Sequence, residues 1–553
     1  MQKSSGGWLS WILPGCVLFI GIGISLGLQL YTRDGVFFSG DAGLKALLAQ
    51  QLSSGQWQVA LDIPQPAWVM SLWQRGLYPF TPPYVYLQQG NYFITFPFTF
   101  PAITAPFYAL AGYHGLYVVP LVSLWVVWGR VWQVCRVWQV PSRMTALSLA
   151  LVILASPLTL YGAMYWEHTL AVALAFWGLS GLILHALPEG QSHRISLNQA
   201  LVNGVCVGLS VWFRPEFLCL AAGMVLVLLA GLVPTNRLPK PLGSVLPRGL
   251  SRGVVAAFVG MMVATMAGFF GLNLVVYGHP LGIHSIQIVE ESSLGQQIAQ
   301  AQANYRQLGL SLVRYFPAAV LGLGLPWLVR GRARSAGTVL WMIGILFAIA
   351  VPLIVPPGAG GKQWGPRFYL ILIPMVGLIV AAGLPYLWQF RRRRWGALAA
   401  IALVMVLGFY TNIISGGFHS YRDRQTNSIS LPSNYLPIAP AIAALDGYDE
   451  PWVAMSHQFV AQQLWPSVRL KTFFRTETED AVKQLAVELV NQGESTFLYV
   501  CYPHSPCPIP TQGRLTVAPA DGNTGDSAMS ISFEALGTFG KYPFYRGSVQ
   551  TGP

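Results

Sequence analysis

Long apolar stretches occupy most of the first three-quarters of the chain. An α-helix needs about 20 apolar residues to cross the hydrocarbon core of a bilayer. By this measure the sequence predicts eleven membrane spans, near residues 8–30, 115–134, 144–164, 168–187, 198–213, 215–233, 253–276, 311–329, 336–355, 367–389 and 396–415. The fifth and sixth are short passes that turn at Arg214–Pro215.

The basic residues between these stretches test the count, because cytoplasmic loops are enriched in Lys and Arg. With a cytoplasmic N-terminus, 16 of the 24 Lys and Arg that precede residue 416 fall on cytoplasmic loops. Merging 198–233 into one pass would break this alternation, which favours two passes. Seven of the eight acids before residue 416 fall on or near the outer face. One explanation is that the protein carries out its chemistry at the outer face. The other is that acids occur on the loops where membrane topology requires no Lys or Arg.

Composition agrees with a multi-pass membrane protein. Of the 553 residues, 54% are hydrophobic and 10% are charged, whereas a soluble protein is about 25% charged. An ordinary soluble enzyme is therefore excluded, and so is a disordered chain, which would be poor in apolar residues. The net charge of +13 does not indicate a nucleic-acid partner, because residues 1–415 carry +16, largely on loops, and residues 416–553 carry −3.

The pattern divides the chain into two domains. Residues 1–415 form a membrane domain with a long first outer loop, 31–112, in which 41–52 predict a short helix and 97–112 an interfacial or re-entrant segment. In the tail, 416–553, the segment "TEDAVKQLAVELVNQG" has helical spacing between the strand-like runs "PWVAMSHQF" and "STFLYVCY". The tail follows the last span and is therefore predicted to be a small extracytoplasmic α/β domain.

Two of the six cysteines lie in this tail, in "CYPHSPC". An extracytoplasmic location favours a disulfide between Cys501 and Cys507. Two reduced thiols are the alternative.

Asp41, in "SGDAGLKAL" just past the first span, is the first candidate catalytic residue. A carboxylate near the membrane surface can accept a proton from an acceptor hydroxyl. It can also hold a divalent cation, Mg or Mn, that neutralises a phosphate leaving group. The structural alternative is a helix N-cap. Lys45, which follows on the same segment, is a candidate ligand of such a phosphate.

Glu167 and His168 lie in "YWEHTL", at the outer end of the third span. An ionisable pair at this position is costly unless it meets water or a partner. Glu167 is a candidate second acid and metal ligand, and His168 a candidate hydrogen-bonding or acid–base group. The alternative is an ordinary interfacial Glu that caps a helix.

Three further basic residues are candidate ligands of a phosphate. Arg214, in "WFRPEF", should have an anionic partner, either Glu216 or a phosphate. Lys362 and Arg367, in "GGKQWGPRFYL", combine glycines with two cations at an outer surface. Their alternative role is that of snorkelling anchors.

This ordered set of features resembles a known family. The acid after span one, the loop ending "FPFTFPAITAPFYALAG", the acid after span three, "GLSVWFRPEF", "GPRFYLILIP" and an outer α/β tail are together similar to the polytopic glycosyltransferases of the C-type (GT-C) fold. These include the protein mannosyltransferases and the aminoarabinose lipid A transferases. Many relatives carry two adjacent acids in the first loop, but here Ala42 follows Asp41.

The resemblance implies a hexosyl- or pentosyltransferase that takes its sugar from a polyprenyl phosphate. It implies an outer acceptor, whether envelope glycan, lipid or protein, and inversion at the transferred sugar. Asp41 would be the base or metal-linked acid and Glu167 the second-loop acid. Arg214, Lys362 or Arg367 would meet the lipid phosphate. We expect a bacterial inner membrane, with the endoplasmic reticulum as the alternative.

Other functional classes make different predictions. A transporter or flippase for a lipid-linked or envelope component predicts ionisable residues in mid-span. Few are found, because most lie at span ends. A non-catalytic scaffold predicts that Asp41 and Glu167 are dispensable. A glycan polymerase or ligase of another fold would not need an acid directly after span one.

Overall fold

The computed structural model describes residues 9–32, 34–37, 40–184, 195–233, 250–283, 294–325, 329, 333–356, 364–387, 391–418, 438–509, 513–517 and 529–551. The chain divides into two compact units. Unit 1 comprises Met1–Tyr31 and Tyr117–Leu431, and unit 2 comprises Thr32–Leu116 and Pro432–Pro553. The long first loop thus clusters with the tail, whereas the hydrophobic pattern predicts a single boundary near residue 415.

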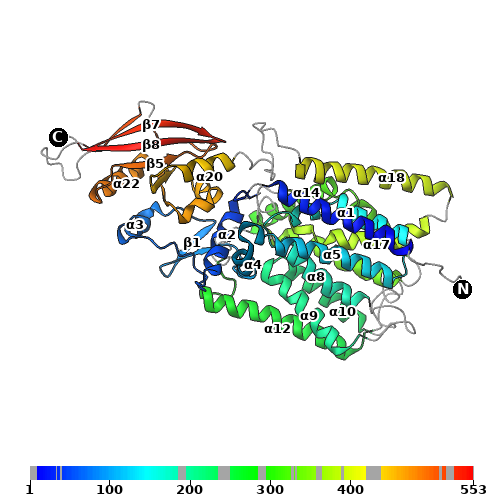
Figure 1. The fold of residues 1–553 in the computed structure, drawn as a ribbon. Helices are drawn as coiled ribbons and strands as arrows, with labels where there is room; N and C mark the ends of the chain where they lie inside the picture. The colour runs from blue at the N-terminus through cyan, green and yellow to red at the C-terminus, as the bar shows by residue number, and fades with distance from the viewer. Residues whose placement is uncertain are drawn as a thin grey trace. The chain divides into compact units, whose positions relative to one another are not determined.

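Unit 1 is helical in its described residues (Figure 1). Its elements are α1 (Leu9–Tyr31), α5 (Val118–Val137), α6 (Ser142–Leu154), α7 (Leu158–Gly162), α8 (His168–Ile183), α9 (Leu197–Phe213), α10 (Phe217–Gly231), α12 (Arg252–Tyr277), α14 (Leu294–Tyr315), α15 (Ala319–Gly324), α16 (Ala333–Ile354), η5 (Arg367–Tyr369), α17 (Leu372–Leu387), α18 (Arg391–Phe409) and η6 (Tyr410–Phe418).

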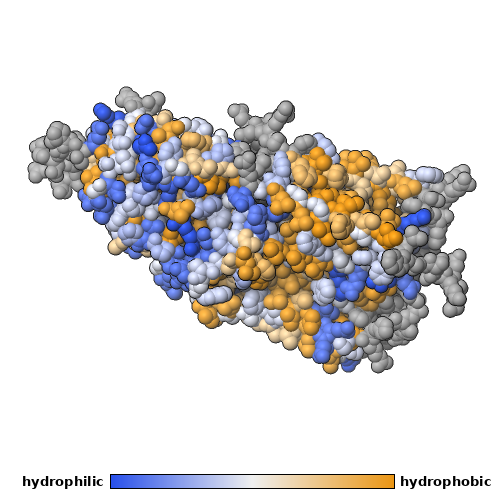
Figure 2. Space-filling view, viewed as in Figure 1, coloured by the Kyte–Doolittle hydropathy of each residue, from blue (hydrophilic) through white to orange (hydrophobic). Residues whose placement is uncertain are grey.

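Five described helical stretches are long and apolar enough to cross a membrane: Trp11–Tyr31, Val118–Val137, Arg252–Tyr277, Ala333–Ile354 and Trp395–Phe418. Shorter apolar helices in unit 1 cover Ser142–Leu154, His168–Ile183, Leu197–Phe213, Phe217–Gly231 and Leu372–Tyr386. Hydrophobic side chains gather over the helices of unit 1 in the space-filling view (Figure 2). Both observations agree with a multi-pass membrane protein.

The helices correct two predicted spans. The predicted span 311–329 is not one helix, because α14 ends at Tyr315 and the six-residue α15 begins at Ala319. Pro317 lies in this break, and proline lacks the N–H that a continuing helix requires. The predicted span 144–164 is likewise divided into α6 and α7 by a break that contains Pro157. Residues 198–233 do form two helices, as predicted.

Small residues let the helices of unit 1 pack closely. A Cβ added at Gly178 of α8 would lie 2.4 Å from the carbonyl oxygen of Asn203 on α9. A Cβ added at Gly204 of α9 would lie 2.4 Å from the carbonyl oxygen of Phe258 on α12. Glycine at both positions therefore allows α9 to approach a neighbour on each side, as small residues do in membrane helix packing.

Unit 2 is an α/β unit (Figure 1). Its sheet has the order β4-β3-β5-β8-β7-β6. Strands β3 (Trp452–Met455), β4 (Thr472–Arg475) and β5 (Thr496–Val500) run parallel to one another, whereas β8 (Tyr542–Thr551) is antiparallel to β5, and the pairings of β6 (Arg514–Val517), β7 (Met529–Phe539) and β8 are also antiparallel. Helix α22 (Glu479–Asn491) lies between β3 and β5 along the chain, as predicted from the two strand-like runs. Strand β4, which directly precedes α22, was not predicted.

The first loop contributes the remaining elements of unit 2, together with three short segments of the tail. These are α2 (Gly40–Ser53), α3 (Ala67–Leu72), η1 (Trp73–Leu77), the hairpin β1 (Val85–Gln88)–β2 (Asn91–Ile94), α4 (Thr99–Gly115), α20 (Ile438–Gly447), α21 (Phe459–Gln463) and η7 (Trp465–Arg469). The Trp73 indole N–H donates to the carbonyl oxygen of Phe473 at 3.1 Å, and the Trp465 indole N–H donates to that of Gly35 at 2.9 Å. Segments some 400 residues apart in the sequence thereby share one core.

Candidate functional site

Three charged residues of unit 1 form a buried ion cluster where helices begin and end. Arg214 follows the last residue of α9, Glu216 precedes α10, and Glu167 precedes α8. The Nε of Arg214 lies 2.8 Å from Oε1 of Glu216, and its Nη1 lies 3.2 Å from Oε1 of Glu167. The side chains of Glu167 and Glu216 are 2% and 5% exposed. We call these three residues the ion cluster.

The ion cluster gives Arg214 two carboxylate partners. The sequence indicated Glu216 or a phosphate as its partner, and it did not indicate Glu167, which lies 47 positions away. A charge buried in an apolar surrounding is tolerated only when it is paired and hydrogen-bonded. The guanidinium therefore bridges the two carboxylates, and it ties the residues that precede α8 and α10 to the end of α9.

A narrow crevice lies beside this cluster, and its walls leave no room for a water molecule. Its polar walls come from His168, Arg214, Glu216 and Arg367, and the rest are apolar side chains such as Phe217. Two arginines and an imidazole face the same space. The arginines supply cationic donors of the kind that bind phosphate. The carboxylate of Glu216 lies among them, and the crevice must widen before it admits a ligand.

Arg367 is held by the segment that precedes α17. Its guanidinium lies 4.7 Å from the ring centroid of Phe368, and the guanidinium of Arg214 lies 5.2 Å from the same ring. The carbonyl oxygen of Trp364 accepts a 2.9 Å hydrogen bond from the Tyr161 hydroxyl. Gly365 has φ +72, a left-handed conformation that favours glycine. Lys362, the other candidate in this segment, lies outside the described residues.

His168 is packed among aromatic rings. Its ring centroid lies 5.0 Å from that of Trp166 and 5.2 Å from that of Tyr161, and the residue is 3% exposed. The structure therefore brings four predicted site residues together in unit 1: Glu167, His168, Arg214 and Arg367.

Asp41 and Lys45 lie in unit 2, on α2. The predicted short helix over 41–52 is confirmed, and Asp41 stands in its first turn. A carboxylate at this position is favoured by the partial positive charge of the helix N-terminus. Lys45 lies one turn later on the same face, is 3% exposed, and places its ammonium 4.6 Å from the ring centroid of Phe96. Its aliphatic stem and charge are thus enclosed by protein.

Helix α2 is pressed against α21 through glycine. A Cβ added at Gly43 would lie 2.0 Å from the carbonyl oxygen of Gln462, which no side chain permits. A Cβ at Gly40 would lie 2.9 Å from Oε1 of Gln462 and 3.8 Å from Cδ1 of Phe459. The "SGDAG" context of Asp41 therefore serves close helix packing, and it places the first turn of α2 beside the start of α21.

Tyr84 is a neighbour of Asp41 that the sequence pattern did not indicate. Burial, the negative charge of Asp41 and nearby Tyr502 together raise the pKa of Tyr84 to about 12. The Tyr84 ring also contacts Phe459, with centroids 5.4 Å apart. The sequence carried a weak signal, because Tyr84 follows Pro82 and Pro83 in the aromatic and proline-rich part of the first loop.

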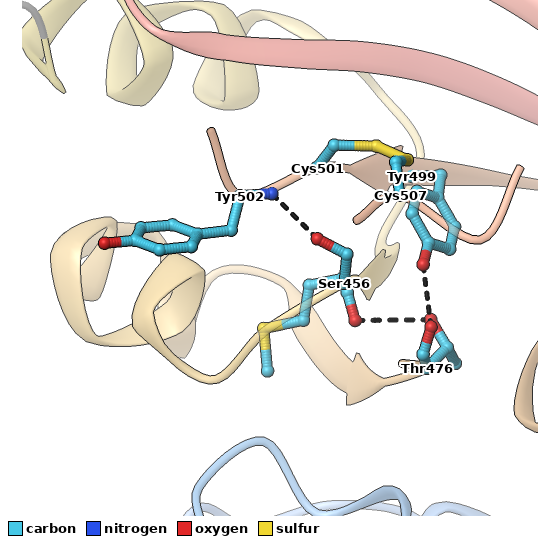
Figure 3. The surroundings of a disulfide bond; sticks show 7 residues. Ser456, Thr476, Tyr499, Cys501, Tyr502 and Cys507 are labelled. Carbon is cyan, nitrogen blue, oxygen red and sulfur yellow. Dashed lines mark hydrogen bonds between the residues drawn. A yellow bond between two sulfur atoms is a disulfide. The ribbon is translucent and has the colours of Figure 1, made fainter. Parts of the chain in front are cut away.

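Cys501 and Cys507 form a disulfide in unit 2 (Figure 3). Next to it, the backbone N–H of Tyr502 donates to Oγ of Ser456 at 2.8 Å, and the Tyr502 side chain extends away from the two sulfurs. The disulfide closes the short loop that carries Tyr502. In the described residues, no three or more His, Cys, Asp or Glu side chains come together as a metal-binding group.

Comparison of this fold with solved structures gives full-length matches. ArnT from Cupriavidus metallidurans in the apo state superposes with a TM-score of 0.56 and 13% identity, over 98% of each chain. The chain has an ArnT-like fold. ArnT bound to undecaprenyl phosphate gives a TM-score of 0.55 and 11% identity over the same shares. The Archaeoglobus fulgidus oligosaccharyltransferase gives 0.46 and 13%, over 89% of this chain and 70% of that chain.

The sequence matches no known family profile and no curated protein. The likeness is therefore one of fold. It confirms the predicted resemblance to the GT-C glycosyltransferase fold, and it agrees with a mostly helical multi-pass membrane protein that carries a C-terminal mixed-sheet domain.

Proposed function

We propose that the protein is a glycosyltransferase that moves a sugar from a polyprenyl-phosphate donor to an extracytoplasmic acceptor, with inversion at the sugar. The observation that carries the proposal is the match over 98% of both chains to ArnT, which was also solved bound to undecaprenyl phosphate. The neighbouring guanidinium groups of Arg214 and Arg367 support it, because such donors bind phosphate once the crevice that they line widens to admit it.

In this reaction Asp41 is the general base, which accepts the proton of the acceptor hydroxyl. The acceptor oxygen forms a bond to the anomeric carbon as its proton passes to the carboxylate. The bond from that carbon to the phosphate oxygen breaks, and the lipid phosphate leaves with the electron pair. A transferase of this kind needs no further reactant, and attack opposite the leaving group inverts the anomeric centre.

Arg367 stabilises the negative charge that develops on the leaving phosphate, because a preorganised cation stabilises such charge. Arg214 already pairs with two carboxylates, so it contributes less to the stabilisation of the leaving phosphate. Glu167 acts mainly through Arg214, whose position it fixes, and His168 is a hydrogen-bonding group of the crevice wall. Lys45 is buried on α2, and its positive charge supports the carboxylate of Asp41 from one helical turn away.

The proposed orientation places the N-terminus in the cytoplasm and unit 2 outside a bacterial inner membrane. The disulfide supports an extracytoplasmic location for unit 2. The alternative function, a transporter or flippase, draws less support from the ion cluster. Arg214, Glu167 and Glu216 lie where helices begin or end, rather than inside spans.

Sugar transfer by the purified protein tests the proposal. The wild type, Asp41→Asn and Arg367→Gln would receive labelled polyprenyl-phosphate hexoses and pentoses, with membrane extract as the acceptor. We expect transfer by the wild type and a loss of about a hundredfold or more in Asp41→Asn, the size typical of a general base. Arg367→Gln should mainly slow donor cleavage, since it lacks the charge that meets the phosphate.

Asp34→Asn is the matched control. Asp34 is also an acid of the first loop, but its side chain is 71% exposed and lies 3.2 Å from His114. The Asp34→Asn variant should transfer sugar at the wild-type rate. Equal transfer by wild type and Asp41→Asn would show that Asp41 only stabilises α2, and movement of intact lipid-linked sugar without transfer would support the transporter instead.

A further inference from the structure

Four half-buried rings of unit 2 form a continuous cluster. Phe459 contacts Tyr84 at 5.4 Å, Tyr502 at 5.6 Å and His457 at 4.7 Å between ring centroids. His457 and Tyr502 stack at 5.0 Å with 24° between their planes. Each of the four keeps part of its surface exposed. We call Tyr84, His457, Phe459 and Tyr502 the ring cluster.

Hydrogen bonds from the backbone hold these rings in place. The backbone N–H of Phe459 donates to Nδ1 of His457 at 3.1 Å, which leaves the proton of the neutral imidazole on Nε2. Burial lowers the pKa of His457, so the neutral form prevails. The Thr81 N–H donates to Oε1 of Gln458 at 3.0 Å, which joins the segment before β1 to the segment that carries two of the rings.

The disulfide fixes the fourth ring. Tyr502 directly follows Cys501, and its N–H donates to Ser456, the residue before His457 (Figure 3). A loop closed over so few residues has little freedom, and a binding surface that is ordered in advance loses less entropy when a ligand binds. The ring cluster is therefore built as a rigid surface rather than as a mobile loop.

The ring cluster borders the first turn of α2. A Cβ at Gly40, the residue before Asp41, would lie 3.8 Å from Cδ1 of Phe459. Asp41 also lies close enough to Tyr84 for its charge to add to burial in raising the pKa of that phenol. A ligand that covers the exposed part of these rings thus reaches the vicinity of the carboxylate assigned to the acceptor proton.

The chemistry of the cluster suits a sugar. A sugar ring has C–H groups on its faces and hydroxyls around its rim. Aromatic faces pack against the former, while tyrosine hydroxyls and an imidazole N–H can bond the latter. A lipid chain would cover these polar groups without satisfying them, which is costly. Three of the four rings carry such a group, and only Phe459 does not.

We propose that the ring cluster is an acceptor subsite that binds a glycan. A sugar ring stacks on Tyr502 and the neighbouring rings of the cluster, close to Asp41. The proposal rests on the proposed glycosyltransferase function and narrows it, because it makes the acceptor a carbohydrate.

Binding of sugar to the purified full-length chain, without donor, tests the proposal directly. Saturation-transfer difference NMR would be recorded with short linear gluco-, manno-, galacto- and arabino-oligosaccharides. We expect at least one of them to bind, and Tyr502→Ala to weaken its binding about tenfold. Tyr502→Phe should retain most of the binding, because it keeps the stacking face.

Trp57→Ala is the matched control, since Trp57 is a 73% exposed aromatic residue of unit 2 outside the ring cluster. It should bind the oligosaccharide like the wild type. If Tyr502→Ala does not fold, Tyr84→Ala takes its place with the same expected loss. The proposal is wrong if no oligosaccharide binds by about 10 mM, or if both cluster variants bind like the wild type.

Photo-crosslinking distinguishes a glycan from the bilayer. p-Benzoyl-phenylalanine in place of Tyr502 would be irradiated in proteoliposomes that contain the bound oligosaccharide, and the adduct identified by mass. A sugar adduct supports the subsite. An adduct with lipid alone would show that the ring cluster faces the membrane and would overturn the proposal.

Kinetics separate this inference from the proposed function. If the wild type transfers sugar, Tyr502→Ala should raise the KM for the acceptor about tenfold with little change in kcat. Asp41→Asn should instead lower kcat. Glycan binding without any transfer would contradict the proposed function but leave the subsite standing. Transfer with an acceptor KM unchanged by Tyr502→Ala would overturn the subsite alone.

Discussion

The ion cluster of unit 1 and the surroundings of Asp41 in unit 2 use charge in opposite ways. In the ion cluster, a guanidinium binds two carboxylates that are almost fully buried, so the charges satisfy one another. Asp41 is half-buried in the first turn of a helix, beside rings that are also partly exposed. A buried, paired charge makes the fold sensitive to the loss of its partner, while a partly exposed charge can meet a substrate.

The difference separates two acids that the sequence presents as equivalent. Glu167 and Asp41 both follow an apolar span and both were candidate catalytic acids. Glu167 is 2% exposed and bonded to Arg214, whereas Asp41 is half-buried and its charge adds to the burial that raises the pKa of Tyr84. We therefore expect substitutions in the ion cluster to act on stability first, and substitutions at Asp41 to act on activity first.

Removing the cation of the ion cluster should have the largest effect on stability. Arg214→Leu leaves two carboxylates buried without their partner, which we expect to cost about 3–5 kcal/mol of unfolding free energy. Thermal unfolding in detergent measures the loss. Arg314→Leu, at an exposed position near the end of α14, is the matched control and should change stability by about 0.5 kcal/mol or less.

A single carboxylate is a smaller loss. Glu167→Gln leaves Arg214 and Glu216 as a neutral pair, so we expect a cost of only about 1 kcal/mol, the scale of one hydrogen bond. Equal destabilisation by Arg214→Leu and Glu167→Gln would contradict the idea that the guanidinium holds both carboxylates.

Close packing around Asp41 should be the next most sensitive feature. Gly43→Ala places a Cβ 2.0 Å from the Gln462 carbonyl oxygen, so α2 must move away from α21. We expect a loss of about 1–3 kcal/mol, as for other overpacked interiors. Gly447→Ala meets no atom within 4 Å and is the control. If both variants unfold at the same temperature, the proposed contact between α2 and α21 does not constrain the helix.

The smallest effect is electrostatic and tests whether Asp41 and Tyr84 are neighbours. Because the pKa of Tyr84 is raised to about 12, from an ordinary value near 10, its contribution to stability is complete below pH 10 and is lost as the pH rises toward 12. In Asp41→Asn the pKa of Tyr84 should fall but stay above its ordinary value, because burial remains.

Phenolate absorbance, taken as the difference between each protein and its own Tyr84→Phe variant, measures this titration. An unchanged pKa of Tyr84 in Asp41→Asn would place the two residues too far apart for a shared role.

Much of the local structure could be predicted from the sequence, because it depends on short-range patterns. The apolar runs, the amphipathic α22, the helix that begins beside Asp41 and the break at Arg214–Pro215 all follow from periodicity and from residues close in the chain. The pattern failed at 311–329, where it counted apolar residues across Pro317 and joined two helices that the backbone separates.

The sequence by itself therefore determined a basic, apolar, multi-pass chain with a polar α/β tail, and it singled out Asp41, Glu167, Arg214 and Arg367. Only the tertiary structure decided which of them meet. Glu167 bonds Arg214 across 47 positions, and the first loop shares a core with strands some 400 residues away. Such contacts depend on packing between distant segments, and hydrophobic periodicity reports only which face of a segment is buried, not what it is buried against.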